Sequence, residues 1–184
     1  LPRPHKMIEY RAAKLRFLNQ LEASCLKALR YRPHVQNRGE LEDMDFLRQY
    51  FPSLREVVGQ LDKIILRCRL LVLDHPGTTF HSALAGNVPM ICFWNHDDWA
   101  LCAEAKPYFE ALEEAGVLFS DAEAAANQIG RVWPNVNSWW KSPKVQKAVV
   151  DCRQRYARTG LFSRIRLAAT LWRLANIDTN GTRL

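Results

Sequence analysis

Two hydrophobic patterns divide the chain into predicted helices and strands. Segments whose apolar residues recur every three or four positions predict helices over residues 9–29, 40–50, 54–68, 79–86, 99–115 and 120–132. Uninterrupted apolar runs predict short strands over residues 70–74, 88–94 and 117–119. Residues 28–32 predict another short strand, which Pro33 ends. A long basic helix is expected from Ser142-Pro143 until Gly160 interrupts it, followed by a last helix over residues 161–175. Strands that alternate with helices in this way are typical of a parallel, doubly wound sheet.

The pattern therefore predicts an α/β fold, in which a Rossmann-like parallel sheet of about four strands is flanked by helices and followed by extra C-terminal helices. We expect residues 1–160 to form this domain and residues 161–184 to form a C-terminal helix and tail. The chain opens on Leu1 without an initiator methionine. We therefore expect a piece of a longer protein, whose preceding part supplies the first strand.

Local signals predict where individual helices begin and end. Gly59 predicts a break within residues 54–68, and Gly116 is expected to follow the end of helix 99–115. Ser120 and Glu123 have the spacing of a capping box at the start of helix 120–132.

Charge is unevenly distributed, with a formal net charge of +7. Residues 1–38 carry nine Lys or Arg and two acids, residues 39–140 carry seven and fifteen, and residues 141–173 carry nine and one. Solvated helix faces are the favoured interpretation, and the alternative is an anionic partner such as a sugar nucleotide or a membrane surface. Since no basic stripe with interleaved aromatics is present, we expect no nucleic-acid partner.

The five cysteines are scattered and form no CxxC pair, which favours a reducing cytoplasm. No Cys/His cluster has metal-ligand spacing, so no metal site is expected. Asp97-Asp98 are adjacent acids, but a turn followed by a helix cap is favoured over metal binding. No apolar run reaches the ~18 residues that span a bilayer.

The most informative stretch is the strand and turn of residues 71–80. A buried strand ends at Asp74, and Gly77-Thr78-Thr79 then opens a helix. Helix N-termini offer unpaired N–H donors and partial positive charge, which suit a phosphate. Gly77 permits close backbone approach, and the two threonines add hydroxyl donors. Ordinary N-capping by threonine is an equally good interpretation.

Several segments in one order resemble the C-terminal part of a family of bacterial surface-carbohydrate-biosynthesis transferases, which are glycosyltransferase-like proteins of the two-Rossmann-domain (GT-B) architecture. The similarity runs from about Phe17 to Gly160. It rests on Arg30-Tyr31-Arg32-Pro33, Thr78-Thr79-Phe80, Ala83-Leu84-Ala85, Pro89 to Asn95, Ala105-Lys106-Pro107-Tyr108-Phe109, Gly116-Val117-Leu118, and Trp139 to Gln146. One departure is Ser82, where the family usually has Glu.

This resemblance implies one half of a GT-B fold, which binds a nucleotide-sugar donor. A glycan or lipid-linked acceptor would be held largely by the missing N-terminal half. The implied enzyme is a glycosyltransferase that needs no metal or other cofactor. Its implied location is the cytoplasm, and the alternative is the cytoplasmic surface of the inner membrane, to which it would bind peripherally. The alternatives are a sugar-nucleotide epimerase and a non-catalytic module for a phosphorylated or anionic partner.

Other candidate site residues cluster at predicted strand ends. His75 is a candidate to bind a phosphate or act as a general acid, with an ordinary loop histidine as the alternative. Arg30 and Arg32 are candidates to grip a diphosphate, with surface charge as the alternative. Trp94 is a candidate to stack on a base or sugar, and Asn95 to bond a hydroxyl.

Two further features belong to predicted helices. Glu104, placed one turn into helix 99–115, is a candidate to reach the donor. The last helix has an apolar face that includes Phe162, Ile165 and Trp172, with arginines elsewhere. We expect this face to pack on protein, and the alternative is an interfacial membrane helix.

Overall fold

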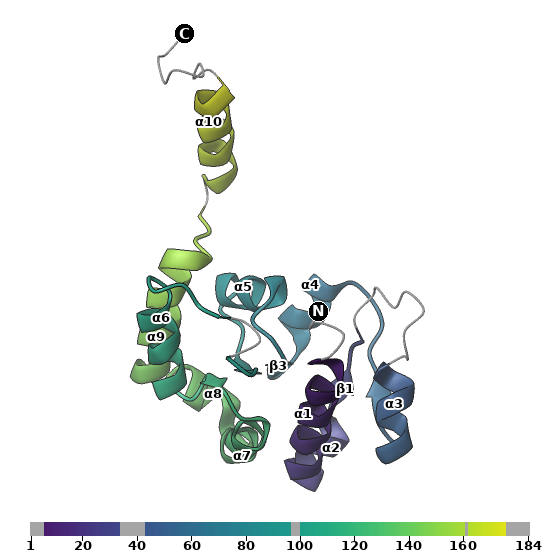
Figure 1. Cartoon of the computed structure of the whole chain (residues 1–184). Coiled ribbons are helices and arrows are strands. Elements are labelled where there is room, and N and C mark those ends of the chain that lie inside the picture. Colours follow the sequence, from purple (N-terminus) through teal and green to yellow (C-terminus); the bar gives the residue numbers. More distant parts are fainter. Residues whose placement is uncertain (1–5, 34–42, 97–99, 161, 176–184) are drawn as a thin grey trace.

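The computed structural model describes residues 6–33, 43–96, 100–160 and 162–175 (Figure 1). Its central element is a parallel sheet of β3 (Leu71–Leu73), β4 (Met90–Phe93) and β5 (Leu118–Phe119), in that spatial order. β4 is buried along its whole length, as its uninterrupted apolar sequence predicts for a central strand.

Helices cover both faces of this sheet. α1 (Met7–Gln20) and α7 (Ala122–Val132) pack together on one face, into which Ile91 and Phe93 of β4 point. Met90 and Cys92 point to the opposite face, where the core is formed with α5 (Thr78–Ala85), α6 (Lys106–Glu114) and α9 (Pro143–Tyr156). The alternation along β4 therefore divides the apolar core into two layers.

The remaining elements surround these layers. They are α2 (Ala23–Ala28), α3 (Asp43–Tyr50), α4 (Leu61–Arg67), the 3₁₀ helix η2 (Trp133–Asn135), α8 (Val136–Trp140) and α10 (Ser163–Ala175). α10 projects away from the rest of the molecule in Figure 1. Within the described residues, no helix combines the length and apolar character needed to cross a bilayer.

The α/β class and the parallel strands are confirmed, but the described strands do not form one four-stranded sheet. β1 (Arg30–Tyr31) and β2 (Arg55–Glu56) pair with each other in parallel, separately from β3, β4 and β5. Both residues of β2 are exposed, so this strand has no apolar face to bury within a central sheet.

Several element boundaries differ from the predicted ones, and the predicted helix 9–29 is divided into α1 and α2. Residues 54–68 form β2 and then α4, separated at Gly59, whose positive φ of 131° confirms the predicted break. α6 begins at Lys106, next to Pro107 in its first turn, and not near residue 99. α7 is capped by Asp121, which accepts from the Ala124 amide at 2.7 Å, and not by Ser120.

Candidate functional site

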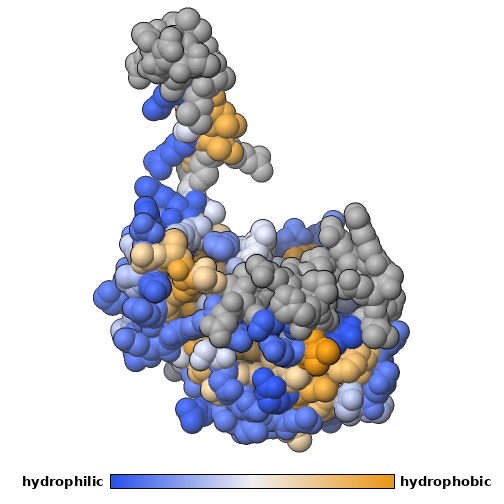
Figure 2. Space-filling model, in the orientation of Figure 1, coloured by the Kyte–Doolittle hydropathy of each residue, from blue (hydrophilic) through white to orange (hydrophobic). Residues whose placement is uncertain are grey.

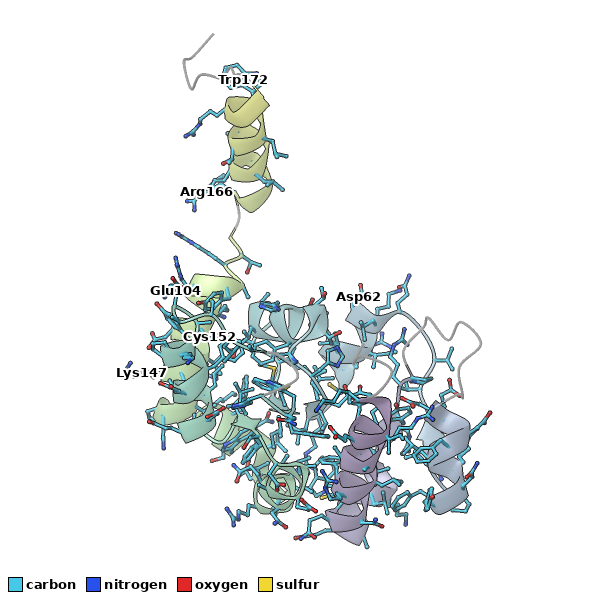
Figure 3. All side chains as sticks on the ribbon, viewed as in Figure 1. Asp62, Glu104, Lys147, Cys152, Arg166 and Trp172 are labelled. Carbon is cyan, nitrogen blue, oxygen red and sulfur yellow. The ribbon has the colours of Figure 1, made fainter. Side chains whose placement is uncertain are left out.

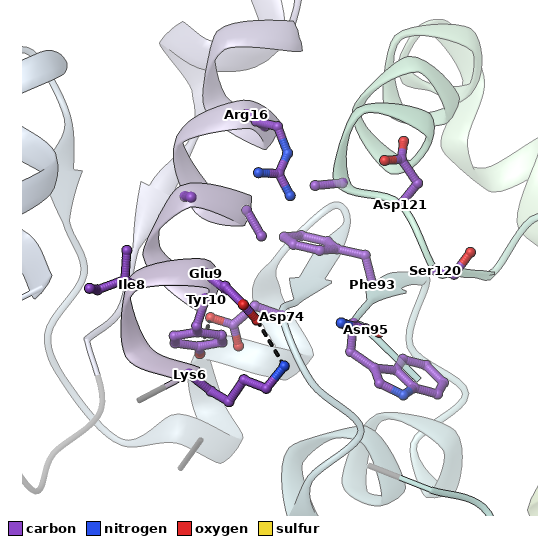
Figure 4. A pocket seen from close by; sticks show the side chains of 14 residues that line it. Lys6, Ile8, Glu9, Tyr10, Arg16, Asp74, Phe93, Asn95, Ser120 and Asp121 are labelled. Carbon is purple, nitrogen blue, oxygen red and sulfur yellow. Dashed lines mark hydrogen bonds and ion pairs between the residues drawn. The ribbon is translucent and has the colours of Figure 1, made fainter. Parts of the chain in front are cut away.

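A pocket of about 480 Å³ opens at the carboxyl ends of β3, β4 and β5. Each strand contributes a residue that follows it directly or closely: Asp74, Asn95 and Ser120. Figure 4 shows α1 running along one side of the pocket, opposite the start of α7. Ligands of open α/β sheets bind in the crevice beyond the carboxyl ends of the strands, which makes this pocket the candidate site.

The lining of the pocket is mixed: apolar side chains such as Ile8 and Phe93 lie beside polar side chains of both charges. Its described cations are Lys6 and Arg16, on the α1 side. Lys6 Nζ lies 2.9 Å from Glu9 Oε2, and Arg16 Nε lies 3.5 Å from Glu123 Oε1. A lining with cations, carboxylates, an amide and a hydroxyl suits a ligand that carries both hydroxyl and anionic groups.

Next to the pocket, α1 buries a lysine. Lys14 is 6% exposed, and its Nζ lies 2.6 Å from Asp43 Oδ2 and 3.2 Å from Asp74 Oδ2. The same Nζ donates to Tyr31 Oη at 3.0 Å and lies 4.2 Å from the ring centroid of Tyr10. Tyr10 Oη in turn donates to Asp74 Oδ2 at 2.5 Å. We call these five residues the Lys14 cluster.

The pKa values within the Lys14 cluster favour the charged lysine and carboxylates. Burial alone would raise the pKa of Asp74, but hydrogen bonds from His75 and Tyr10 and the charge of Lys14 hold it well below its usual range. Burial would lower the pKa of Lys14, but the surrounding carboxylates and tyrosines raise it above its usual value. The pKa of Asp43 is likewise lowered: burial opposes this shift, and Lys14 and Arg11 outweigh it.

These shifts predict how folding stability depends on pH. The pKa values of Asp74 and Asp43 are lower in the folded than in the unfolded chain. Their contribution to folding stability is therefore complete above about pH 4 and is lost as the pH falls below it. The pKa of Lys14 is raised, so its contribution is complete below about pH 10 and is lost above it.

The acid limb can be tested by urea unfolding of wild type and Asp43→Asn from about pH 3 to about pH 7. Wild type should lose more unfolding free energy toward acid than the variant, because the variant has one fewer carboxylate to protonate. Parallel pH profiles for the two proteins would contradict the assignment.

Asp74 also orients a histidine at the same strand end. His75 Nδ1 lies 2.9 Å from Asp74 Oδ1, and the His75 side chain is 38% exposed. Because Asp74 is ionised, Nδ1 is the donor in this bond, and in the neutral imidazole Nε2 is then the acceptor nitrogen. The ring lies close over Gly77, where a Cβ atom would come within 2.7 Å of Nε2. The Asp74 carboxylate thus orients the imidazole ring. Gly77 leaves room for the ring because it has no side chain.

The other predicted phosphate-binding residues follow His75 along the turn. Gly77 is the N-cap of α5, with Thr78 and Thr79 in its first turn, and no side chain caps this helix end. Thr78 is exposed and Thr79 is half-buried. The hydroxyls of Thr78 and Thr79 therefore do not cap the helix. Neither residue is among those that line the pocket.

Of the predicted site residues, Trp94 and Asn95 line the pocket. Trp94 is 3% exposed and packs edge-on against Phe109, with ring centroids 6.0 Å apart. Its Nε1 has no hydrogen-bond partner within the described part of the chain. The ring thus lies largely in the core, whereas Asn95 is exposed at the pocket.

Three predicted site residues lie elsewhere. Arg30 donates to the carbonyls of residues 27–29 at the end of α2, and Arg32 donates to the Gly59 carbonyl at 2.9 Å. Glu104 lies in the turn before α6, and Figure 3 places it beside α9. Its carbonyl accepts from Tyr156 Oη at 3.2 Å. None of the three is among the residues that line the pocket.

The acidic pair Asp97-Asp98 lies outside the described residues. Among residues 6–33, 43–96, 100–160 and 162–175, no group of three or more His, Cys, Asp or Glu side chains has a metal-binding arrangement.

The sequence interpretation missed the Lys14 cluster, although a signal for Lys14 exists. In the predicted helix 9–29, Lys14 lies four residues after Tyr10 and three and four before Phe17 and Leu18, and so falls on the buried face. A charged residue on an apolar helix face requires a partner of opposite charge. Asp43, at the start of α3, and Asp74, the first residue after β3, are those partners.

Comparison with known proteins identifies the family. A family model described as LIC12162 family transferase matches residues 1–170. No curated protein and no solved structure matches the chain. Because the matched span covers nearly the whole sequence, the chain belongs to the LIC12162 family of transferases.

Proposed function

We propose that this transferase is a glycosyltransferase of the GT-B type and that the chain forms its Rossmann-like, donor-binding half. The observation that carries the proposal is the pocket at the carboxyl ends of β3, β4 and β5. In this proposal the acceptor is a bacterial surface polysaccharide or glycolipid, held largely by a second domain. The resemblance of residues 17–160 to surface-carbohydrate transferases supports that acceptor class.

The donor is proposed to be a nucleotide sugar that occupies the pocket. Asn95 and Ser120 would bond hydroxyls of the nucleoside or sugar, since both line the pocket with polar side chains. The donor phosphates would lie toward the start of α5, where the unpaired backbone N–H groups and the hydroxyls of Thr78 and Thr79 can donate. Arg16 would add positive charge from the α1 side.

His75 is proposed as the residue that moves the proton. With Nδ1–H bonded to Asp74, Nε2 can accept the proton of the acceptor hydroxyl. The acceptor oxygen then forms its bond to the anomeric carbon, and the bond to the phosphate oxygen breaks with its electron pair on the leaving nucleotide. Asp74 stabilises the positive charge that develops on the imidazole. We propose that helix-end donors and arginine meet the phosphate charge, so that the reaction needs no metal.

Donor binding can be tested by calorimetric titration with UDP-, GDP- and CMP-sugars. We expect one class to bind, and the double variant Thr78→Ala/Thr79→Ala to weaken that binding by about 1–3 kcal/mol, as for one or two lost charge-assisted hydrogen bonds. Binding should persist in EDTA. A matched control is Thr159→Ala/Thr170→Ala, which removes two exposed threonines far from the β3–α5 turn in the sequence.

Three outcomes would count against the proposal. Equal affinities of wild type and the Thr78/Thr79 variant would remove the start of α5 from the site. Loss of binding in EDTA, restored by Mg²⁺, would require a metal. Failure of the full-length protein to bind any nucleotide sugar would favour a different kind of transferase.

A further inference from the structure

α10 exposes apolar side chains that the body of the molecule does not cover. Leu167, Leu171 and Trp172 are 60%, 57% and 70% exposed, and Ile165 is 66% exposed. In Figure 2 the projecting helix is orange on one side and blue on the other. Exposed large apolar side chains gathered on one short helix mark a surface that binds a partner.

The exposed apolar face is broader than the predicted one. It was expected to include Phe162, Ile165 and Trp172, and the structure adds the exposed Leu167 and Leu171. At about 100° per residue, Leu167, Leu171 and Trp172 follow one another around one half of the helix, whereas Arg166 and Arg173 fall in the other half. The helix is therefore amphipathic, with Arg166 and Arg173 on its polar side.

The charge of this region favours an anionic partner. No Asp or Glu occurs between residues 152 and 177, whereas six arginines do. Packing against a second copy of the same helix would bring Arg166 and Arg173 near like charges, with no acid on the helix to pair with them. A surface that is apolar within and negatively charged at its boundary is complementary to both sides of α10.

From this complementarity we propose that α10 docks on an anionic membrane surface. The exposed apolar side chains enter the boundary between headgroups and acyl chains; they are Ile165, Leu167, Leu171 and Trp172. Arg166 and Arg173 contact the lipid phosphates. Tryptophan suits this position because its ring is apolar and its N–H remains hydrogen-bonded at the interface. The proposal stands independently of the donor pocket, since the two lie on different parts of the chain.

The proposal can be tested by sedimentation of the full-length protein with phosphatidylcholine vesicles, with and without phosphatidylglycerol. We expect binding to the phosphatidylglycerol vesicles, weakened by salt. Arg166→Glu/Arg173→Glu should reduce it at least about tenfold, since each cation contributes about fivefold. The matched control Lys141→Glu/Lys144→Glu makes the same charge change at exposed residues outside α10 and should reduce binding by less than about threefold.

A second variant separates membrane docking from packing on protein. Trp172→Ala should weaken vesicle binding and leave the melting temperature unchanged if the face meets lipid. Absence of binding to anionic vesicles would overturn the proposal, and so would an equal loss of binding in the arginine and lysine variants. A lower melting temperature for Trp172→Ala without vesicle binding, or an α10-dependent dimer, would show that protein covers the face.

Discussion

Replacing Lys14 by methionine is expected to lower the free energy of unfolding by about 3–5 kcal/mol, which is the cost of removing one partner from a buried ion cluster. The methionine fills a similar volume, so the loss comes from charge and not from a cavity. Asp43 and Asp74, whose side chains are 20% and 26% exposed, would remain partly buried without the cation that now lies 2.6 Å and 3.2 Å from their oxygens. Urea unfolding at neutral pH measures the effect.

The matched control is Lys147→Met. Lys147 Nζ lies 2.9 Å from Asp151 Oδ2, but its side chain is 80% exposed. Water already solvates both charges of such a pair, so this variant should melt like wild type. If Lys14→Met and Lys147→Met were equally stable, the Lys14 cluster would not hold the fold together.

Replacing His75 by alanine is expected to reduce the rate of the proposed sugar transfer by about 10²–10⁴-fold, the range that a positioned acid–base residue contributes. Donor affinity should change far less, since the proton moves only during transfer. The measurements are kcat, with the nucleotide sugar that titration identifies as the donor, and the Kd of that donor. Added imidazole should restore part of the lost rate, because it can replace the missing proton acceptor.

A glycine provides the control for this prediction. Gly77→Ala places a methyl group 2.7 Å from His75 Nε2 and should displace the ring, so that activity falls while the fold persists. For Gly86→Ala, at the other end of α5, the nearest atoms to the added methyl group are Val88 Cγ2 at 3.3 Å, the Ser82 carbonyl oxygen at 3.5 Å and Leu66 Cδ2 at 3.8 Å, so this variant should remain active. Full activity of His75→Ala, or of Gly77→Ala with an unmoved histidine, would contradict a role for His75 in proton transfer.

Asp74 connects these two predictions, because it contacts both Lys14 and His75. Its Oδ2 accepts from Tyr10 and lies near Lys14, while its Oδ1 faces His75 Nδ1. Any change to the Lys14 cluster therefore also alters the charge that orients His75. A screen of variants should measure stability and activity together before either effect is assigned.

The sequence alone was sufficient to determine the alternation of helices and strands and the parallel orientation of β3 and β4. These features follow from local patterns, since an uninterrupted apolar run can be satisfied only where both faces are covered. It also located the turn from Asp74 to Thr79 and the break at Gly59, although the residues before Gly59 form a strand and not a helix. Glycine marks this break because it permits backbone conformations that other residues rarely adopt.

The pairing of strands and the composition of the site were decided by the tertiary structure. β1 and β2 are 24 residues apart or more, and two-residue strands carry too little periodicity to predict a partner. The Lys14 cluster joins residues 10 and 14 of α1 with residue 31 of β1, residue 43 of α3 and residue 74 after β3. A buried charge is stable only when opposite charges and donors converge on it in three dimensions, and spacing along a chain does not encode that convergence.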